Sequence, residues 1–300
     1  MTALPERALL GLNTRIWECM PDGMKASGPT LAYGRWLHKL VCRQPNHEMY
    51  LGTMFLRNRP ALELMRRLIE ERSRGSTVKI AVLGCSIGVE AYSILWVLRR
   101  DRPDLNIVVE AVDISREALE VARLGVYGSE TSAMVGSEIF ERLSESELED
   151  MFVWDGTEAR VQPWLQESVT WEIADVGDQQ AVRSLGEHDL VVASNFLCHM
   201  DERSAERCMR NFAPLVRPGG YVFVSGVDLD VRTRVARELG WEPVAALRAE
   251  MHDGDPLVRA DWPLRRWGLE PLDLARSDWE MRYASAFKVG ANEAPPRHDA

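Results

Sequence analysis

The sequence contains few cysteines, and no two of them form a recognisable motif. There are five, and none stands in a C-x-x-C pattern with another. An odd number of scattered cysteines indicates neither a structural zinc site nor a disulfide framework. We therefore expect no metal site, and a reducing compartment. The five are Cys19, Cys42, Cys85, Cys198 and Cys208.

Positive charge and long apolar runs are also scarce. The formal net charge is -10 and the isoelectric point is about 5.2, so the phosphates of a nucleic acid would be repelled. No run approaches the roughly 20 apolar residues that span a bilayer, and residues 1–7 lack the basic and apolar regions of a secretory signal. We expect a cytoplasmic protein with neither a nucleic-acid nor a membrane partner. Its 46% of hydrophobic residues suffice for a large core.

Strand-like and helix-like segments alternate along most of the chain, which predicts an α/β fold with a doubly wound, mostly parallel sheet. Two late strand-like segments, 240–246 and 282–289, have no helical crossover between them and suit an antiparallel edge. The earlier predicted strands are 78–83, 107–112, 169–173, 189–193 and 221–225, and the main predicted helices among them are 90–100, 115–124, 202–215 and 231–239.

Changes in pattern divide the chain into parts. Residues 1–59 are mixed in pattern and interrupted by prolines, and we expect a helical N-terminal segment there. Residues 60–290 would form the main domain, with an insertion at 251–278 that is rich in tryptophan, proline and charge. Long insertions of this kind are usually functional loops. Residues 291–300 are expected to be a disordered tail.

The segment after the first predicted strand is typical of a cofactor turn. Gly84 ends the strand, Gly88 follows, and a helical pattern begins near Glu90. A strand, a glycine turn and a helix N-terminus together present backbone N–H groups to a ligand. The G-x-G-x-x-G register of dinucleotide sites fails here, and a carboxylate would repel a pyrophosphate. The turn fits a cationic cofactor without phosphate, which describes S-adenosylmethionine, although the glycine spacing alone fits an ordinary β–α connection equally well.

Several longer segments point, in one colinear order, to a known family. The clearest are Gly-Cys-Ser-Ile-Gly-Val-Glu-Ala-Tyr-Ser at 84–93, Ala-Val-Asp-Ile-Ser-Arg-Glu-Ala-Leu-Glu-Val-Ala-Arg-Leu-Gly-Val-Tyr at 111–127 and Asn-Phe-Ala-Pro-Leu-Val-Arg-Pro-Gly-Gly-Tyr-Val-Phe at 211–223. These segments resemble the CheR-type chemotaxis receptor glutamate methyltransferases. Residues 53–57 resemble the family's Thr-x-Phe-Phe-Arg element, and 160–175 are similar to the segment before its third core strand. The resemblance covers about 51–225. It implies a Rossmann-like class I methyltransferase fold, with a seven-stranded sheet and an antiparallel last strand, that uses S-adenosylmethionine.

The resemblance also implies roles for residues at the expected strand ends. Glu90 matches the acidic residue that contacts the donor's amino-acid end, and Asp113 matches the carboxylate that binds the ribose hydroxyls. Asp175 stands in the place of the polar residue on the adenine side, and Asn195 matches the residue near the sulfonium. The full set of implied cofactor-binding residues is Thr53, Arg57, Gly84, Glu90, Asp113, Ile114, Asp175, Val176 and Asn195.

The residues themselves support these roles and leave alternatives open. Asp113, Asp175 and Asn195 each follow a predicted strand, at the rim where an open α/β sheet binds ligands. A carboxylate there can accept both hydroxyls of a ribose. Alternatively, Asp113 could cap the next helix and Asp175 could belong to a turn. Glu90 could be a first-turn helix charge, and Arg57 a surface arginine.

The acceptor side departs from the family's pattern. Where the family has Cys-Arg-Asn-x-x-x-Tyr after the fourth strand, this chain has Ser194 in the place of the arginine and His199 in the place of the tyrosine. Serine cannot replace the bidentate clamp of an arginine on a carboxylate. We expect Ser194, His199, Trp262 and Trp267 to face the acceptor. The tryptophans could instead form a surface flap or the contact of a homodimer.

Three hypotheses for function follow from a retained donor side and an altered acceptor side. The sequence favours an S-adenosylmethionine-dependent methyltransferase that O-methylates a small molecule by direct in-line transfer. An ionised carboxylate needs no base, whereas a phenol, alcohol or ammonium would, and His199 is then the candidate catalytic base. Packing beneath the loop after the fourth strand is the alternative role of this histidine. The second hypothesis is a protein-glutamate O-methyltransferase of chemoreceptors, and the third is a regulatory protein that binds S-adenosylmethionine without turnover.

Overall fold

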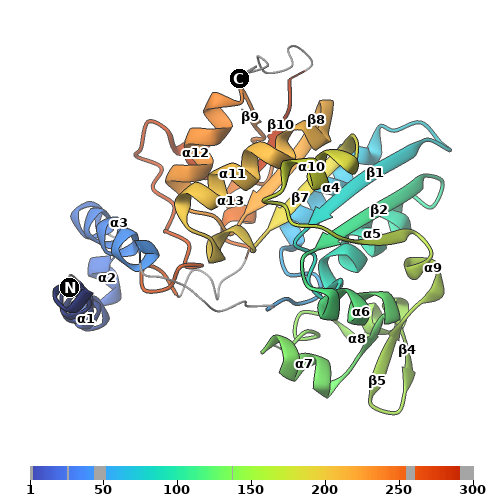
Figure 1. The fold of residues 1–300 in the computed structure, drawn as a ribbon, viewed down its shortest axis with the longest axis horizontal. Coiled ribbons are helices and arrows are strands. Elements are labelled where there is room, and N and C mark those ends of the chain that lie inside the picture. The colour runs from blue at the N-terminus through green and yellow to red at the C-terminus, as the bar shows by residue number, and fades with distance from the viewer. Residues whose placement is uncertain (1–2, 26, 44–51, 137, 255–260, 291–300) are drawn as a thin grey trace.

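A single large sheet forms the centre of the molecule (Figure 1). The computed structural model describes residues 3–25, 27–43, 52–136, 138–254 and 261–290. Its main sheet has seven strands in the order β6-β2-β1-β7-β8-β10-β9. The expected tail lies outside the described residues, as do parts of the N-terminal segment and of the insertion.

The strands from β6 to β8 run parallel, and β10 is antiparallel to both of its neighbours, β8 and β9. The predicted α/β fold with an antiparallel last strand is therefore confirmed. The last strand also inserts between β8 and β9, so that the short β9 forms the edge. The strands are β1 Thr77–Leu83, β2 Asn106–Asp113, β6 Val169–Ile173, β7 His188–Ser194, β8 Val216–Ser225, β9 Glu242–Pro243 and β10 Ala286–Lys288.

Helices cover both faces of this sheet, and side chains alternate between two cores because successive residues of a strand point to opposite faces. In β1, Ile80 and Val82 belong to one core, whereas Ala81 and Leu83 belong to the other. The first core is completed by α4 Arg59–Glu70, α5 Val89–Asp101 and α6 Arg116–Leu124, and the second by α10 Gln179–Ser184, α11 Glu202–Phe212 and α12 Leu229–Glu238.

A second sheet, antiparallel and with the order β3-β5-β4, lies below the main one in Figure 1. From the sequence pattern alone, residues 128–166 are expected to form only a polar, partly helical region. Its aromatic side chains enclose Phe55, whose ring meets those of Tyr127 and Phe152 edge to face, with ring centroids 5.3 and 5.0 Å away. The elements of this region are β3 Val126–Tyr127, α7 Ser129–Val135, α8 Glu145–Met151, β4 Phe152–Asp155, β5 Glu158–Val161 and α9 Pro163–Gln166.

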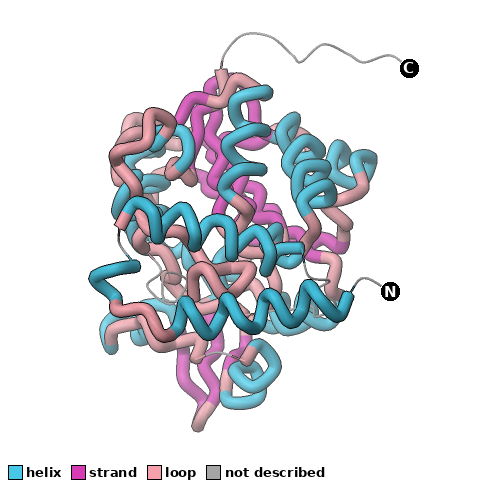
Figure 2. Tube along the Cα trace, turned by 90° about the vertical axis from the view of Figure 1, so that its left-hand side faces the viewer, coloured by secondary structure: helices cyan, strands magenta, loops and turns pink. Residues whose placement is uncertain are grey.

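The N-terminal helices lie to one side of the main sheet, at the left of Figure 1. They are α1 Ala3–Glu18, α2 Asp22–Lys25 and α3 Gly28–Arg43. Figure 2 shows the two long ones running across the front of the molecule. A small core of Trp17, Leu31, Leu37 and Trp262 joins them to the segment before β10.

The chain after β9 returns toward these helices. It forms α13 Arg248–His252 and, further along, α15 Trp279–Arg282, before it enters the sheet as β10. The described residues also include two short 3-10 helices, Leu197–His199 and Ala213–Leu215. In the described part of the chain we find no helix with both the length and the apolar character needed to cross a bilayer.

Candidate functional site

A cavity of about 530 Å³ lies at the carboxyl ends of the parallel strands. This is the size range and the position of ligand sites in open α/β sheets. It is enclosed by α3 on one side and by residues 262–285 on another. All the residues predicted for the donor and acceptor sites line it: Thr53, Arg57, Gly84, Glu90, Asp113, Ile114, Asp175, Val176, Ser194, Asn195, His199, Trp262 and Trp267.

The turn after β1 depends on its two glycines. Gly84 has a φ of +65° and Gly88 a φ of +84°, conformations that other residues rarely adopt. A Cβ on Gly84 would lie 2.7 Å from the ring of Phe196, and one on Gly88 would lie 2.6 Å from the ring of Trp171. Both positions thus require glycine, and the turn brings bare backbone to the cavity at the start of α5.

Asp113, the last residue of β2, ties that turn to its own strand. One carboxylate oxygen accepts the N–H of Ser86 at 2.7 Å, and the other accepts the N–H of Ser115 at 2.8 Å. The helix that follows is capped by Ser115, whose hydroxyl accepts the N–H of Ala118. Asp113 is therefore not the cap of α6. Its carboxylate faces the cavity from a fixed position, with lone pairs still able to accept ribose hydroxyls.

Glu90 projects from the first turn of α5 into the cavity. Burial raises the pKa of its carboxyl, while a hydrogen bond with Ser194 and the positive charge of Arg57 oppose part of that rise. A buried carboxylate of this kind gains stability from a cationic ligand, because the ligand's charge offsets the lost hydration. The ammonium group of an amino-acid end is such a ligand, so the donor set fits S-adenosylmethionine.

The far end of the cavity, beyond β2 and β6, mixes apolar and polar surface. Ile114 is 58% exposed although it is a large apolar residue, and both it and the buried Val176 line the cavity. Asp175 uses one carboxylate oxygen to accept the N–H of Gly177 at 2.7 Å, which is the turn role that the sequence left open. An exposed isoleucine at this rim suits the flat face of a base such as adenine.

Asn195 follows β7 in a left-handed conformation, with a φ of 59°. Its N–H donates to the carbonyl of Ser225, the last residue of β8, at 3.1 Å. A Cβ on Gly226 would lie 2.5 Å from the Cα of Asn195, so the two strand ends touch at this point. The amide side chain thus enters the cavity floor from a tightly held backbone.

The segment before α4 is held by buried backbone contacts, which place Thr53 and Arg57 at the cavity. The N–H of Phe55 donates to the carbonyl of Ile139 at 2.9 Å. The N–H of Leu56 donates to the hydroxyl of Ser93 at 3.0 Å, which joins the segment to α5. Arg57 therefore reaches the cavity as a positioned side chain, which disfavours the alternative of a surface arginine.

His199 lies where β7 leads toward α11, within reach of two arginines. Burial lowers the pKa of its imidazole, and the positive charges of Arg266 and Arg57 lower it further. The ring stands 6.3 Å from that of Trp267, centroid to centroid. Because the lowered pKa keeps the imidazole neutral at pH 7, the positive charge at this end of the cavity comes from the arginines.

The two tryptophans of the insertion differ in their surroundings. Trp262 is only 6% exposed and packs edge-on against Trp17, with centroids 5.4 Å apart. A Cβ on Gly34 would lie 2.3 Å from its ring, so α3 and Trp262 are in close contact. Trp267 donates its indole N–H to Asp261. Trp262 thus mainly joins the N-terminal helices to the insertion, and Trp267 is the one beside His199.

The sequence did not point to several further residues of the cavity wall. Arg35, His38 and Lys39 reach it from α3, and Asp228 and Arg232 reach it from the start of α12. Asp228 follows β8, so the rule that identified polar residues after the other strands would have found it.

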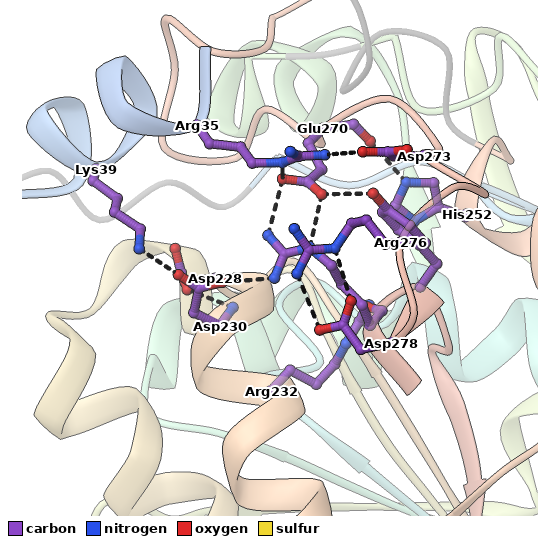
Figure 3. A network of polar contacts seen from close by, with 12 residues as sticks. Arg35, Lys39, Asp228, Asp230, Arg232, His252, Glu270, Asp273, Arg276 and Asp278 are labelled. Carbon is purple, nitrogen blue, oxygen red and sulfur yellow. Dashed lines mark hydrogen bonds and ion pairs between the residues drawn. The ribbon is translucent and has the colours of Figure 1, made fainter. Parts of the chain in front are cut away.

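Charged side chains from three parts of the chain meet in a network at this wall (Figure 3). Glu270 is its centre and accepts from the guanidinium of Arg282 at 2.7 and 2.9 Å, from Tyr283 at 2.7 Å and from Arg35 at 3.2 Å. Arg282 also pairs with Asp230 at 2.6 Å. These contacts hold α3, the insertion and α12 together around the cavity.

The family of the chain follows from the comparison of its sequence with known families. Residues 52–231 match the family described as CheR methyltransferase, SAM binding domain. The chain belongs to this family. The match agrees with the glycine turn, the strand-end carboxylates and the sheet order described above, and it confirms the predicted methyltransferase class and the predicted cofactor, S-adenosylmethionine.

Relatives with assigned names are similar over the same region. A chemotaxis protein methyltransferase of Listeria monocytogenes is 28% identical over 179 residues, which are 58% of this chain and 63% of the relative. Chemotaxis protein methyltransferase 2 of Vibrio cholerae is 26% identical over 57% of this chain and 60% of its own length. A probable biofilm formation methyltransferase of Pseudomonas aeruginosa is 26% identical over 59% of this chain and 41% of its own length. The chain thus spans less than two thirds of the length of these relatives.

Proposed function

We propose that this protein transfers a methyl group from S-adenosylmethionine to a carboxylate oxygen of an anionic acceptor. The donor part of the proposal rests on Glu90, Asp113 and Asn195, which line one cavity from the first turn of α5, the end of β2 and the residue after β7. Glu90 would hold the donor's ammonium and Asp113 its ribose, while Thr53 and Arg57 would meet its carboxylate. When bound, S-adenosylmethionine supplies a methyl group on a positively charged sulfur.

The observation that carries the acceptor part is the positive charge around His199. Arg57 and Arg266 both line the cavity, and both lower the pKa of this histidine. Arg266 comes from the insertion and brings a guanidinium to the acceptor side, where Ser194 stands in the place of the family's arginine. An anionic acceptor would be stabilised there, and a cationic one repelled.

Such an acceptor needs little chemical assistance from the protein. A carboxylate is already ionised at pH 7, because its reference pKa is about 4. The chain's contribution is to orient the acceptor and to exclude water, and orientation alone can supply on the order of 7–11 kcal/mol. His199 then has no proton to remove, and it acts as a neutral wall of the acceptor chamber.

Two kinds of carboxylate are candidates. The names of the relatives favour a glutamate side chain of a chemoreceptor, which was the second hypothesis from the sequence. The enclosure of the cavity by α3 and the insertion favours the first hypothesis in a narrower form, namely a small carboxylic acid. We rank the receptor glutamate first, because the relatives bear on the acceptor more directly than the shape of the wall does.

The test is a transfer assay with methyl-labelled S-adenosylmethionine. Purified protein is incubated with chemoreceptor-containing membranes or with a panel of small carboxylic acids, and the products are treated with alkali. We expect label that alkali releases as methanol, because a methyl ester is hydrolysed by base. Label that resists alkali would contradict a carboxylate acceptor, and donor binding without any product would favour a regulatory protein instead.

A further inference from the structure

A histidine, a cysteine and an aspartate from two helices meet beside the cavity. His38 and Cys42 lie one turn apart on α3, and Asp228 caps the start of α12. One ligand atom of each residue lies within 4.8 Å of those of the other two. His38 and Asp228 also line the cavity. Imidazole, thiolate and carboxylate are the three ligand types that zinc binds in proteins.

The spacing of the first two ligand atoms matches a tetrahedral ion. The Nε2 of His38 lies 3.6 Å from the Sγ of Cys42. An ion at the usual zinc distances, about 2.0–2.1 Å from nitrogen and about 2.3 Å from sulfur, separates two tetrahedral ligands by about 3.6 Å. The separation of these two atoms is therefore already that of two ligands of one zinc ion.

The other nitrogen of His38 has the partner that a metal-bound histidine usually has. Nδ1 lies 3.1 Å from the carbonyl oxygen of Pro263. Since a carbonyl can only accept, Nδ1 carries the proton, and Nε2 presents its lone pair toward Cys42. This contact orients the ring independently of the cysteine, and it comes from the insertion rather than from α3.

Asp228 has one carboxylate oxygen committed and one available as a ligand. Oδ1 accepts the N–H groups of Asp230 and Val231 at 2.8 and 3.2 Å. Among the described residues, we find no hydrogen bond or ion pair to Oδ2. The helix cap thus holds the carboxylate in place without using its second oxygen.

We propose that His38, Cys42 and Asp228 form a binding site for a divalent transition-metal ion, zinc above all, with the fourth position open to water. A soft sulfur ligand with an imidazole selects zinc over magnesium or calcium. The ion would join α3 to α12 at the cavity wall. This departs from our expectation of no metal site, because the third ligand is far from the first two in the sequence.

Burial raises the pKa of the Cys42 thiol to about 12, so without a metal the cysteine is protonated. Burial also lowers the pKa of His38, which leaves the imidazole neutral. The same contacts could therefore be a plain hydrogen bond from thiol to imidazole. Metal binding would displace the thiol proton, and the test below separates the two cases.

The experiment uses the full chain after treatment with a chelator. It is titrated with cobalt(II), whose thiolate complexes have a charge-transfer absorption band, and then with zinc(II) in competition with a chromogenic chelator. We expect one ion per chain, and a cobalt–thiolate band that zinc abolishes. The melting temperature, measured with and without zinc, should rise on binding.

Two variants and a matched control complete the test. Cys42→Ser should lose the band, and Asp228→Asn, which keeps a helix-capping side chain, should bind zinc at least tenfold more weakly. Cys19→Ser changes an exposed cysteine elsewhere and should bind like the wild type. A wild type without the band, or either site variant binding zinc as tightly as the wild type, would overturn the proposal. None of these measurements depends on methyl transfer.

Discussion

Asp113 holds the backbone of Ser86: its carboxylate accepts that N–H at 2.7 Å, and so fixes the glycine turn after β1 to the tip of β2. Ser86 has a left-handed φ of 51°, which this contact helps to hold. The two strand ends that would bind the donor are thus already joined. Preorganisation of this kind saves the cost of ordering a turn when the ligand arrives.

Asp113→Asn should weaken the binding of both S-adenosylmethionine and adenosine at least tenfold. A hydrogen bond to a charged group is worth about 1.5–3 kcal/mol, and about 1.4 kcal/mol corresponds to a factor of ten. Calorimetry measures the affinities, and circular dichroism checks that the variant is folded. Asp155→Asn, in the exposed hairpin of the second sheet, is the control and should bind normally.

Glu90→Gln should weaken the binding of S-adenosylmethionine but not that of adenosine, which lacks the amino-acid end. The wild-type affinity should also fall as the pH drops through the raised pKa of Glu90, because the protonated carboxyl no longer attracts an ammonium. In the variant this pH dependence should be absent. If the variant loses affinity equally for both ligands, Glu90 does not contact the amino-acid end of the donor.

His199→Gln should leave kcat within about threefold of the wild type if the acceptor is a carboxylate. A general base typically raises the rate 10²- to 10⁴-fold, so removing one would lower kcat by a factor that is easily measured. Because the pKa of His199 is lowered, its imidazole is already neutral at pH 7. We therefore expect kcat to be independent of pH from pH 7 upward. A loss of a hundredfold, with a changed acid limb in the pH profile, would indicate an acceptor that must lose a proton.

Glu270→Gln should destabilise the fold by about 3 kcal/mol, the lower end of the range for breaking a buried ion pair. Asp230 still pairs with Arg282, which is why the lower end applies. The side chains of Glu270 and Arg282 are only 5% and 7% exposed. Urea unfolding measures the loss. Glu202→Gln is the control, since its carboxylate is 64% exposed and the change should cost less than about 1 kcal/mol.

The pH dependence of that loss has a definite sign. Burial alone would raise the pKa of Glu270, but the contacts from Arg282, Tyr283 and Arg35 leave it below its ordinary value. The ion pair therefore stabilises the protein fully above the unfolded pKa of about 4.3, and this contribution is lost as the pH falls through the lowered pKa. The difference between wild type and variant should shrink at acid pH. A difference that grows there would contradict this account of the network.

The sheet and its ligand-binding rim were predictable from local patterns. Strands such as β1 and β7 are short apolar runs, and the residue that follows is Gly84 in one case and Asn195 in the other. Periodicity, the glycine turn and the rule for open sheets therefore suffice. The small antiparallel sheet was not predicted, because β3 has only two residues and β4 and β5 four each. Such strands are stabilised by tertiary packing around Phe55 and have no clear period of their own.

The cavity wall formed by α3, the insertion and the start of α12 could not be predicted, for a different reason. Arg35 and Glu270 meet across 235 residues of sequence, and His38 meets the carbonyl of Pro263 across 225. Nothing in the local pattern of α3 distinguishes a polar face that borders a cavity from one that faces water. Contacts of this kind depend on how the insertion folds back, which periodicity does not encode.

The most direct test of the central claim is a crystal structure with S-adenosylhomocysteine. We predict that it lies in the cavity, with its ammonium beside Glu90, its ribose hydroxyls on Asp113 and its sulfur toward Asn195. Clear density for the ligand at another place, or in the cavity with the ribose away from Asp113, would contradict the account.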